Sequence, residues 1–279
     1  MKLAKVIQHM GAAAAELEPA LNDREVDRFA IDSRDVQAGS LFFALSQPDY
    51  KNNGFNGDFD DATKFVRSAF ENGAVAAVVR TDRFDVNQAD LAEFADRIIQ
   101  VEDVIRAFQN LAHGVYLEWN KPVVAITGSA GKTTAKEFTA HVLESSGRRV
   151  LRNVKNYNNG LGHPLTVLGL AEDPSYDLAV LEMGMSTPMN EIGRLCKITP
   201  PDLAVEIVSP SDTAVELEVK VHDYLRNGAL RVWVVYPDSR RVAVHRPDGT
   251  ARWYSEDAAI EDEGLLPGFS LPLREIFGL

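Results

Sequence analysis

The chain has 279 residues, of which 45% are hydrophobic and 25% charged, a globular composition with enough length for two or three small domains. Its formal net charge of −12 argues against general affinity for nucleic acid, and a single cysteine, Cys196, excludes an internal disulfide or a multi-cysteine metal site. No apolar run approaches the roughly 20 residues that span a bilayer, and the charged N-terminus lacks a signal-peptide pattern. We therefore expect a cytoplasmic protein without membrane insertion.

Residues 1–120 have the pattern of a small mixed α/β domain. The expected elements are strands at 29–31, 40–45 and 73–79 and helices at 61–72 and 104–119. The segment 47–61 is rich in Asn, Gly and Asp and is expected to be a loop. Lys121-Pro122 then follows as a hinge before the next apolar run.

The next apolar run, 123–127, leads into Gly-Ser-Ala-Gly-Lys-Thr-Thr and then a helical pattern over 133–145. Two glycines let a backbone turn and approach an anion closely, and the phosphate would lie at a helix N-terminus. Lys132 would reach the terminal phosphates and the Thr133 hydroxyl would ligate Mg²⁺. The expected nucleotide-binding residues are Gly128, Ser129, Ala130, Gly131, Lys132, Thr133 and Thr134. An ordinary strand-turn-helix would give the same short spacing.

Further strands are expected near Val150 and at 178–183, and this alternation with helices indicates a parallel sheet with right-handed crossovers. Glu182 falls at the end of a strand, where a carboxylate is well placed to hold Mg²⁺ opposite the glycine turn. A solvated glutamate at a strand end is the alternative. Residues 153–166 form a loop dense in amides and glycines, which suits either a polar substrate or turn formation.

Together these residues resemble the Mur ligases over about residues 20–205, most closely the branch that joins D-alanyl-D-alanine to UDP-N-acetylmuramoyl-tripeptide. The motifs that carry the resemblance are Ile31-Asp32-Ser33-Arg34, Gly39 to Leu45, Thr127 to Thr134, Asn156 to Leu165 and Leu181 to Ser186. The resemblance also accounts for the short glycine turn, because the family uses a TGxxGKT form.

The resemblance implies an ATP- and Mg²⁺-dependent ligase of peptidoglycan precursor synthesis. A peptide carboxylate is activated as an acyl phosphate, which the amine of the incoming dipeptide displaces. The implied residues are Ser33 and Arg34 for the UDP end of the substrate, Lys132 and Thr133 for ATP and Mg²⁺, Glu182 for Mg²⁺, and Asn158 and Asn159 within the site. Lys132 and Glu182 are the implied catalytic residues.

From about residue 200 to 277 the sequence instead resembles the C-terminal half of the Uma-type restriction endonucleases of the PD-(D/E)xK superfamily. Asp202 and Glu206 are four apart on one expected strand, so their side chains share a face and are expected to bind one divalent ion. Lys220 on the following helix would stabilise a phosphodiester transition state. In the alternative interpretation Glu206 is an ordinary strand residue, and Lys220 belongs to a charged helix face with Glu216 and Asp223.

The sequence thus predicts an α/β chain in three parts. These are an N-terminal UDP-substrate domain (1–120), a truncated ATP-binding central domain with a P-loop and a parallel sheet (121–200), and a nuclease-like α+β module (201–279). The open edge of the central sheet must pair with another strand: either the tail strands cover it, or an unpaired edge would invite association. Three functions follow: a ligase whose activity is in doubt because the family's C-terminal domain is missing, a Mg²⁺-dependent nuclease, or a nucleotide-binding protein without catalysis.

Overall fold

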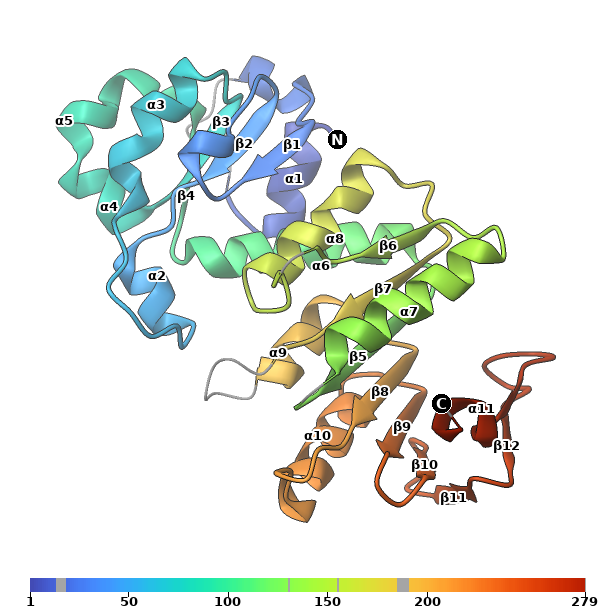
Figure 1. The fold of residues 1–279 in the computed structure, drawn as a ribbon. Helices are drawn as coiled ribbons and strands as arrows, with labels where there is room; N and C mark the ends of the chain where they lie inside the picture. Colours follow the sequence, from blue (N-terminus) through green and yellow to red (C-terminus); the bar gives the residue numbers. More distant parts are fainter. Residues whose placement is uncertain (14–18, 130, 155, 185–190, 279) are drawn as a thin grey trace. The chain divides into compact units, whose positions relative to one another are not determined.

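The computed structural model describes residues 1–13, 19–129, 131–154, 156–184 and 191–278, and its mixed α/β architecture confirms the predicted fold class. The chain separates into two compact units. One contains Met1–Asn120 and Gly160–Pro174, and the other contains Lys121–Asn159, Ser175–Ser186 and Asn190–Leu279. Figure 1 shows the elements of both units. The three-part division by domain origin remains a proposal.

The first unit contains a four-stranded parallel sheet in the order β1-β2-β3-β4. The strands are β1 (Arg28–Ala30), β2 (Ser40–Phe43), β3 (Ala76–Arg80) and β4 (Ile98–Val101). The helices are α1 (Leu3–Met10), α2 (Gln47–Asn52), α3 (Val66–Glu71), α4 (Thr81–Val86), α5 (Gln88–Leu91), α6 (Val104–Trp119) and α8 (Gly162–Glu172). Short 3₁₀ turns lie at 19–23, 33–35, 62–65 and 92–97.

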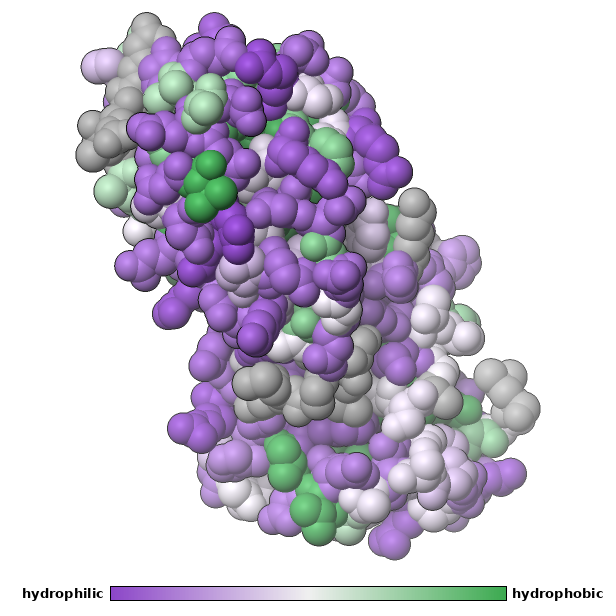
Figure 2. All heavy atoms as spheres, turned by 90° about the vertical axis from the view of Figure 1, so that its left-hand side faces the viewer, coloured by the Kyte–Doolittle hydropathy of each residue, from purple (hydrophilic) through white to green (hydrophobic). Residues whose placement is uncertain are grey.

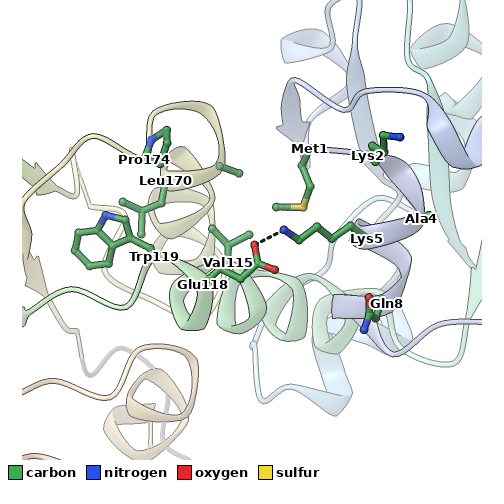
Figure 3. Close-up of a pocket in the computed structure, with 11 residues that line it drawn as sticks. Met1, Lys2, Ala4, Lys5, Gln8, Val115, Glu118, Trp119, Leu170 and Pro174 are labelled. Carbon is green, nitrogen blue, oxygen red and sulfur yellow. Dashed lines mark ion pairs between the residues drawn. The ribbon is translucent and has the colours of Figure 1, made fainter.

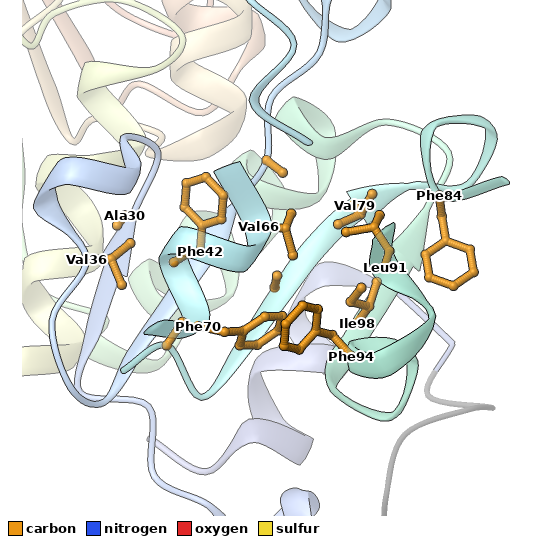
Figure 4. Packing of buried hydrophobic residues seen from close by; sticks show 14 residues of the cluster. Ala30, Val36, Phe42, Val66, Phe70, Val79, Phe84, Leu91, Phe94 and Ile98 are labelled. Atoms are coloured by element: carbon orange, nitrogen blue, oxygen red, sulfur yellow. The ribbon is translucent and has the colours of Figure 1, made fainter. Parts of the chain in front are cut away.

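Apolar side chains from β2 and β3 form the core of this unit with residues of the surrounding helices. Phe42 and Val79 are fully buried, and the rings of Phe70 and Phe94 stack with centroids 4.8 Å apart (Figure 4). Strands buried on both faces explain why the sequence shows short continuous apolar runs here rather than clean alternation.

Residues 47–61 were expected to be a loop, but the structure begins them with helix α2. The physical reason is a capping box: the Ser46 hydroxyl and the Asp49 carboxylate satisfy each other's exposed backbone N–H groups at the helix start. Pro48 in the first turn also favours the helix. The sequence analysis also missed β4, and the expected helix at 61–72 begins with a 3₁₀ turn, Ala62–Phe65.

Replacing Asp49 by alanine is expected to destabilise this unit by about 2–4 kcal/mol. The fully buried carboxylate accepts hydrogen bonds from the Ser46 N–H (2.9 Å) and hydroxyl (2.6 Å) and from the Val104 N–H (3.0 Å). Alanine would leave those donors, at the starts of α2 and α6, without an acceptor. Urea unfolding followed by circular dichroism measures the loss. The exposed Asp90→Ala is the control, and a loss from Asp49→Ala no larger than the control's would contradict the prediction.

The second unit contains a seven-stranded sheet in the order β11-β10-β9-β8-β5-β7-β6. The strands are β5 (Val123–Gly128), β6 (Val150–Arg152), β7 (Leu178–Glu182), β8 (Leu203–Ile207), β9 (Arg231–Tyr236), β10 (Arg241–His245) and β11 (Ala251–Ser255). The other elements are α7 (Lys132–Ser145), α9 (Glu191–Ile198), α10 (Ala214–Arg226), β12 (Ala259–Glu261), β13 (Ser270–Pro272) and α11 (Leu273–Phe277). The neighbouring strands β6, β7, β5, β8 and β9 are parallel, as the alternation of strands and helices predicted.

The tail strands continue the central sheet, which confirms that they cover its edge. β5 pairs with β8 through residues such as Val124 and Leu203, and β8 then pairs with β9 in parallel register. Two antiparallel strands, β10 and β11, complete this side. Behind them, Trp233 and Tyr254 pack in a cluster that also contains Leu203. The predicted central domain and tail therefore share one sheet, and Val124 of β5 packs against the cluster of the tail.

Hydrophilic side chains dominate the face drawn in Figure 2, and hydrophobic ones form only scattered spots. No helix within the described ranges has the length and apolar character needed to cross a bilayer.

Candidate nucleotide-binding site

The glycine turn between β5 and α7 has a backbone that only glycine accommodates well. Gly128 has φ 138° and Gly131 has φ 75°, both in the region that L side chains disfavour. A Cβ on Gly128 would also lie 2.4 Å from the carbonyl oxygen of Ile207, so the end of β8 leaves no room for a side chain. Gly131 is the N-cap of α7, which begins at Lys132. The turn therefore leads directly into a helix N-terminus, as the sequence predicted.

Lys132 and Thr133 occupy the first positions of α7. The Lys132 ammonium donates a 2.6 Å hydrogen bond to the Gly128 carbonyl, so its charge lies against the turn. The Thr133 hydroxyl donates to Glu182 Oε2 at 2.8 Å. Ser129 and Thr134 are exposed, whereas Ala130 lies outside the described residues.

Glu182 ends β7, beside Ile126 of β5. Only 3% of the residue is exposed, so the alternative of a solvated glutamate is wrong. Its two carboxylate oxygens accept from different donors, Oε2 from Thr133 and Oε1 from the Asn158 amide at 2.8 Å. The structure thus brings together three of the predicted residues from separate parts of the sequence. Asn159 follows in the same loop and is half-buried.

Asn153 was missed as a site residue, although it orients Glu182. Its side-chain amide donates to the Glu182 carbonyl (2.8 Å) and its Oδ1 accepts from the Glu182 N–H (2.9 Å). The same amide reaches the Tyr157 carbonyl, and the buried Lys136 ammonium donates to the Asn153 carbonyl at 2.6 Å. The sequence offered one indication of this role, because Asn153 lies in the amide-rich loop 153–166. Asn153 fixes the backbone from which the Glu182 carboxylate projects.

Ser33 and Arg34 form a 3₁₀ turn in the first unit after β1. The Asp32 carboxylate accepts from the Arg34 N–H and from its Nε, each at 2.9 Å. The Arg34 side chain is 87% exposed. Hydrogen bonds from Arg34 lower the pKa of Asp32, so this ion pair is formed at neutral pH.

The predicted ion site shared by Asp202 and Glu206 is wrong. Asp202 accepts from the Val123 N–H at 2.8 Å, at the start of β5, whereas Glu206 lies opposite Thr127 near the other end of that strand. Two residues four apart on a strand share a face but lie about 13 Å apart, too far to bind one ion. Within the described ranges, no three His, Cys, Asp or Glu residues form a group that could hold a metal.

Glu206 and Lys220, by contrast, do meet. The Lys220 ammonium lies 2.6 Å from Glu206 Oε1 and 3.4 Å from Asp212 Oδ1. Glu206 is fully buried and Lys220 is 6% exposed, so Lys220 does not belong to a solvated helix face with Glu216 and Asp223. Burial raises the pKa of Glu206, against the opposing effect of Lys220. Asp212, which the sequence analysis did not single out, also accepts a hydrogen bond from the Ser129 hydroxyl.

A pocket of about 780 Å³ lies in the first unit between α1, α6 and α8 (Figure 3). Val115, Trp119 and Leu170 give it an apolar wall, and Lys5 pairs with Glu118 at 2.7 Å across it. None of the predicted site residues lines this pocket.

Two family models match the chain, and they overlap. The Mur ligase middle domain matches residues 126–207, and a family described as "putative restriction endonuclease" matches residues 173–274. Their overlap, 173–207, contains β7 and β8.

Curated relatives named UDP-N-acetylmuramoyl-tripeptide–D-alanyl-D-alanine ligase match about two thirds of the chain. The Bacillus subtilis enzyme is 36% identical over 187 residues (67% of this chain, 36% of the enzyme), and that of Synechocystis is 34% identical over 183 (66% and 36%). The chain thus spans about a third of these relatives' length.

Solved structures of MurF have the same fold. MurF from Thermotoga maritima in complex with ADP has a TM-score of 0.60 at 25% identity, covering 84% of this chain and 59% of that one. MurF from Acinetobacter baumannii has a TM-score of 0.61 at 23% identity, covering 90% and 59%. The chain is therefore a homologue of the MurF-type Mur ligases over about two thirds of its length, and its C-terminal region matches the family described as putative restriction endonuclease.

Proposed function

We propose that the loop from Gly128 to Thr134 binds MgATP, and that the chain carries the nucleotide-binding part of a MurF-type ligase reaction. The observation that supports this most directly is the contact of Thr133 with Glu182 beside the glycine turn. The Thr133 hydroxyl and the Glu182 carboxylate, two oxygen groups that suit Mg²⁺, lie at one edge of the sheet. They are next to the glycine turn, where the backbone at Gly128 leaves no room for a Cβ.

Each residue then has a defined role. Backbone N–H groups of the turn and the N-terminus of α7 bind phosphate oxygens, and the Lys132 ammonium neutralises their charge. The Thr133 hydroxyl and the Glu182 carboxylate hold Mg²⁺, while Asn153 and Asn158 keep Glu182 in place. When bound, MgATP supplies the phosphoryl group that activates a peptide carboxylate as an acyl phosphate.

The proposed substrates are those in the relatives' names, UDP-N-acetylmuramoyl-tripeptide and D-alanyl-D-alanine. Ser33 and Arg34 are the proposed contacts of the UDP end, and Asn158 and Asn159 are proposed to bind substrate within the site. The three-part organisation at 1–120, 121–200 and 201–279 and a cytoplasmic location belong to the same proposal.

Phosphate release from MgATP tests the proposal, with the UDP-linked peptide and the dipeptide omitted one at a time. We expect release that requires both substrates and survives Lys197→Ala, an exposed lysine on α9 that serves as control. If the folded chain binds MgATP but releases no phosphate, it is a nucleotide-binding protein without ligase activity. Absence of MgATP binding at millimolar concentration would refute the proposal.

A metal-dependent nuclease is the second candidate, supported by the restriction endonuclease-like match and by the contact of Glu206 with Lys220. Its weakness is that Glu206 is fully buried and already engaged. Cleavage of supercoiled plasmid in Mg²⁺ or Mn²⁺ that disappears in Glu206→Gln would support it. We expect no cleavage.

A further inference from the structure

The turn between β8 and α10 brings an acidic side chain to the glycine turn. The Ser129 hydroxyl donates a hydrogen bond to Asp212 Oδ1, although the two residues are 83 positions apart in the sequence. Ser129 lies inside the expected phosphate cradle, directly after Gly128. Asp212 comes from the region that matches the restriction endonuclease-like family and not the Mur ligase domain.

The Asp212 carboxylate is held firmly in this position. Its Oδ2 accepts from the Ser209 N–H at 2.7 Å, and its Oδ1 lies 3.4 Å from the Lys220 ammonium. Only 6% of the side chain is exposed. These two donors, from the turn and from α10, hold the carboxylate beside Ser129.

This carboxylate is ionised at neutral pH. Burial would raise its pKa, but the hydrogen bonds from Ser129 and the Ser209 backbone, together with Lys220, hold the pKa below its usual value. Lys220 neutralises it only partly, because the ammonium lies closer to Glu206, at 2.6 Å, than to Asp212. A negative charge therefore remains next to the phosphate cradle.

We propose that Asp212 weakens nucleotide binding at the glycine turn, both by engaging the Ser129 hydroxyl and by repelling the phosphates electrostatically. The inference rests on the proposed binding of MgATP. Phosphate oxygens seated on the turn would lie within a few ångströms of Ser129, where like charges at a partly buried site repel strongly. The opposing attraction comes from Lys132, at the Gly128 carbonyl. The nuclease-like tail thereby sets the affinity of the Mur ligase-like loop.

Asp212→Asn tests the charge, because asparagine keeps the shape and an oxygen that accepts from Ser129. We expect MgADP, titrated by calorimetry into the full chain, to bind the variant roughly tenfold more tightly than the wild type. Asp248→Asn is the matched control. It removes an exposed carboxylate at the β10–β11 turn and should leave the affinity unchanged.

Ser129→Ala separates the charge from the hydrogen bond. It removes the hydroxyl, which then cannot bind phosphate either, but keeps the Asp212 charge, so the affinity should stay unchanged or fall. An equal gain in the two variants would overturn the electrostatic account. Asp212→Ser removes the charge with a smaller side chain and replaces Asp212→Asn if that variant unfolds.

Two further outcomes would overturn the inference, and Lys132→Ala distinguishes them. If Lys132→Ala weakens MgADP binding while Asp212→Asn leaves it unchanged or weaker, the loop binds nucleotide and only the role of Asp212 is wrong. If neither the wild type nor Asp212→Asn binds MgADP at millimolar concentration, the nucleotide site and the inference fail together. Thermal unfolding of each variant verifies that it is folded.

Discussion

Replacing Lys132 by alanine is expected to lower substrate-dependent phosphate release to less than about a tenth of the wild-type rate. The ammonium is the positive charge held directly on the glycine turn, 2.6 Å from the Gly128 carbonyl. Without it, the charge that develops on the transferring phosphoryl group would be left to Mg²⁺ and backbone donors alone. MgADP affinity should fall as well, because the same charge attracts the bound phosphates.

The fold should tolerate this change. The hydrogen bond to Gly128 lies in a turn and is only partly buried, so its loss is expected to cost about 1 kcal/mol or less in urea unfolding. Lys132→Arg keeps the charge on a bulkier group and should retain more activity than alanine. If the alanine variant keeps more than a tenth of the activity, Lys132 is not part of the proposed site. If the alanine variant does not fold, the MgADP affinity of Lys132→Arg tests the role of Lys132 instead.

Replacing Lys220 by alanine is expected to destabilise the second unit by about 3–5 kcal/mol. The change leaves the fully buried Glu206 carboxylate without its partner at 2.6 Å. Replacing both residues, Glu206→Leu with Lys220→Met, should recover most of the loss, because no charge is then buried alone. The exposed pair of Arg274 with Asp257 is the control, and Arg274→Ala should cost far less than Lys220→Ala because solvent screens this pair.

The loss caused by Lys220→Ala should depend on pH. Burial raises the pKa of Glu206 in the folded chain above its ordinary value of 4.5, and removing Lys220 removes an effect that opposes this rise. A carboxyl whose folded pKa is raised prefers to be protonated in the folded state, so the variant loses stability as pH rises above about 4.5. Urea unfolding at pH 5 and pH 7.5 should give the smaller loss at pH 5. Equal losses would mean that Glu206 is not the affected group.

Local sequence predicted the strand-turn-helix geometry of the glycine turn because its determinants are adjacent residues. Gly128, Gly131 and Lys132 lie within five positions, and the strand before them and the helix after them follow from apolar periodicity. Glu182 was found by a topological rule, since parallel strands end at one edge of a sheet. Its exact partners, Thr133 and Asn158, could be anticipated only as neighbours in that edge.

Tertiary contacts explain the residues that sequence analysis missed. Asp212 reaches Ser129 only because β8 pairs with β5, and nothing in the sequence around Asp212 indicates that contact. Asn153 lies in a loop with several other asparagines, and the sequence does not show which of them contacts Glu182. The wrong prediction of an ion site at Asp202 and Glu206 has a different origin. The alternation of side chains along a strand places both residues on one face, but four residues of extended strand keep the two carboxylates too far apart.

The position of β8 suits the junction between the two families. Both family models include it, and it pairs in parallel with β5 on one side and β9 on the other. Because both sides of β8 are paired, the hydrogen-bond ladder is continuous from the central strands to the tail strands. Ala204 of β8 and Val232 of β9 are register partners across the junction, and both are fully buried.

The pairing of β5 with β8 also constrains the order of folding. Val124 and Leu203 are register partners although a long stretch of chain, including α7 and β7, lies between them. Contacts between residues so far apart in sequence close late and slow the folding of a sheet. During synthesis one edge of β5 stays unpaired until residues 203–207 have left the ribosome. Until then the unpaired edge can pair with another chain and aggregate. Release of the chain before that point would leave a sheet with an open edge, a form that chaperones and proteases recognise.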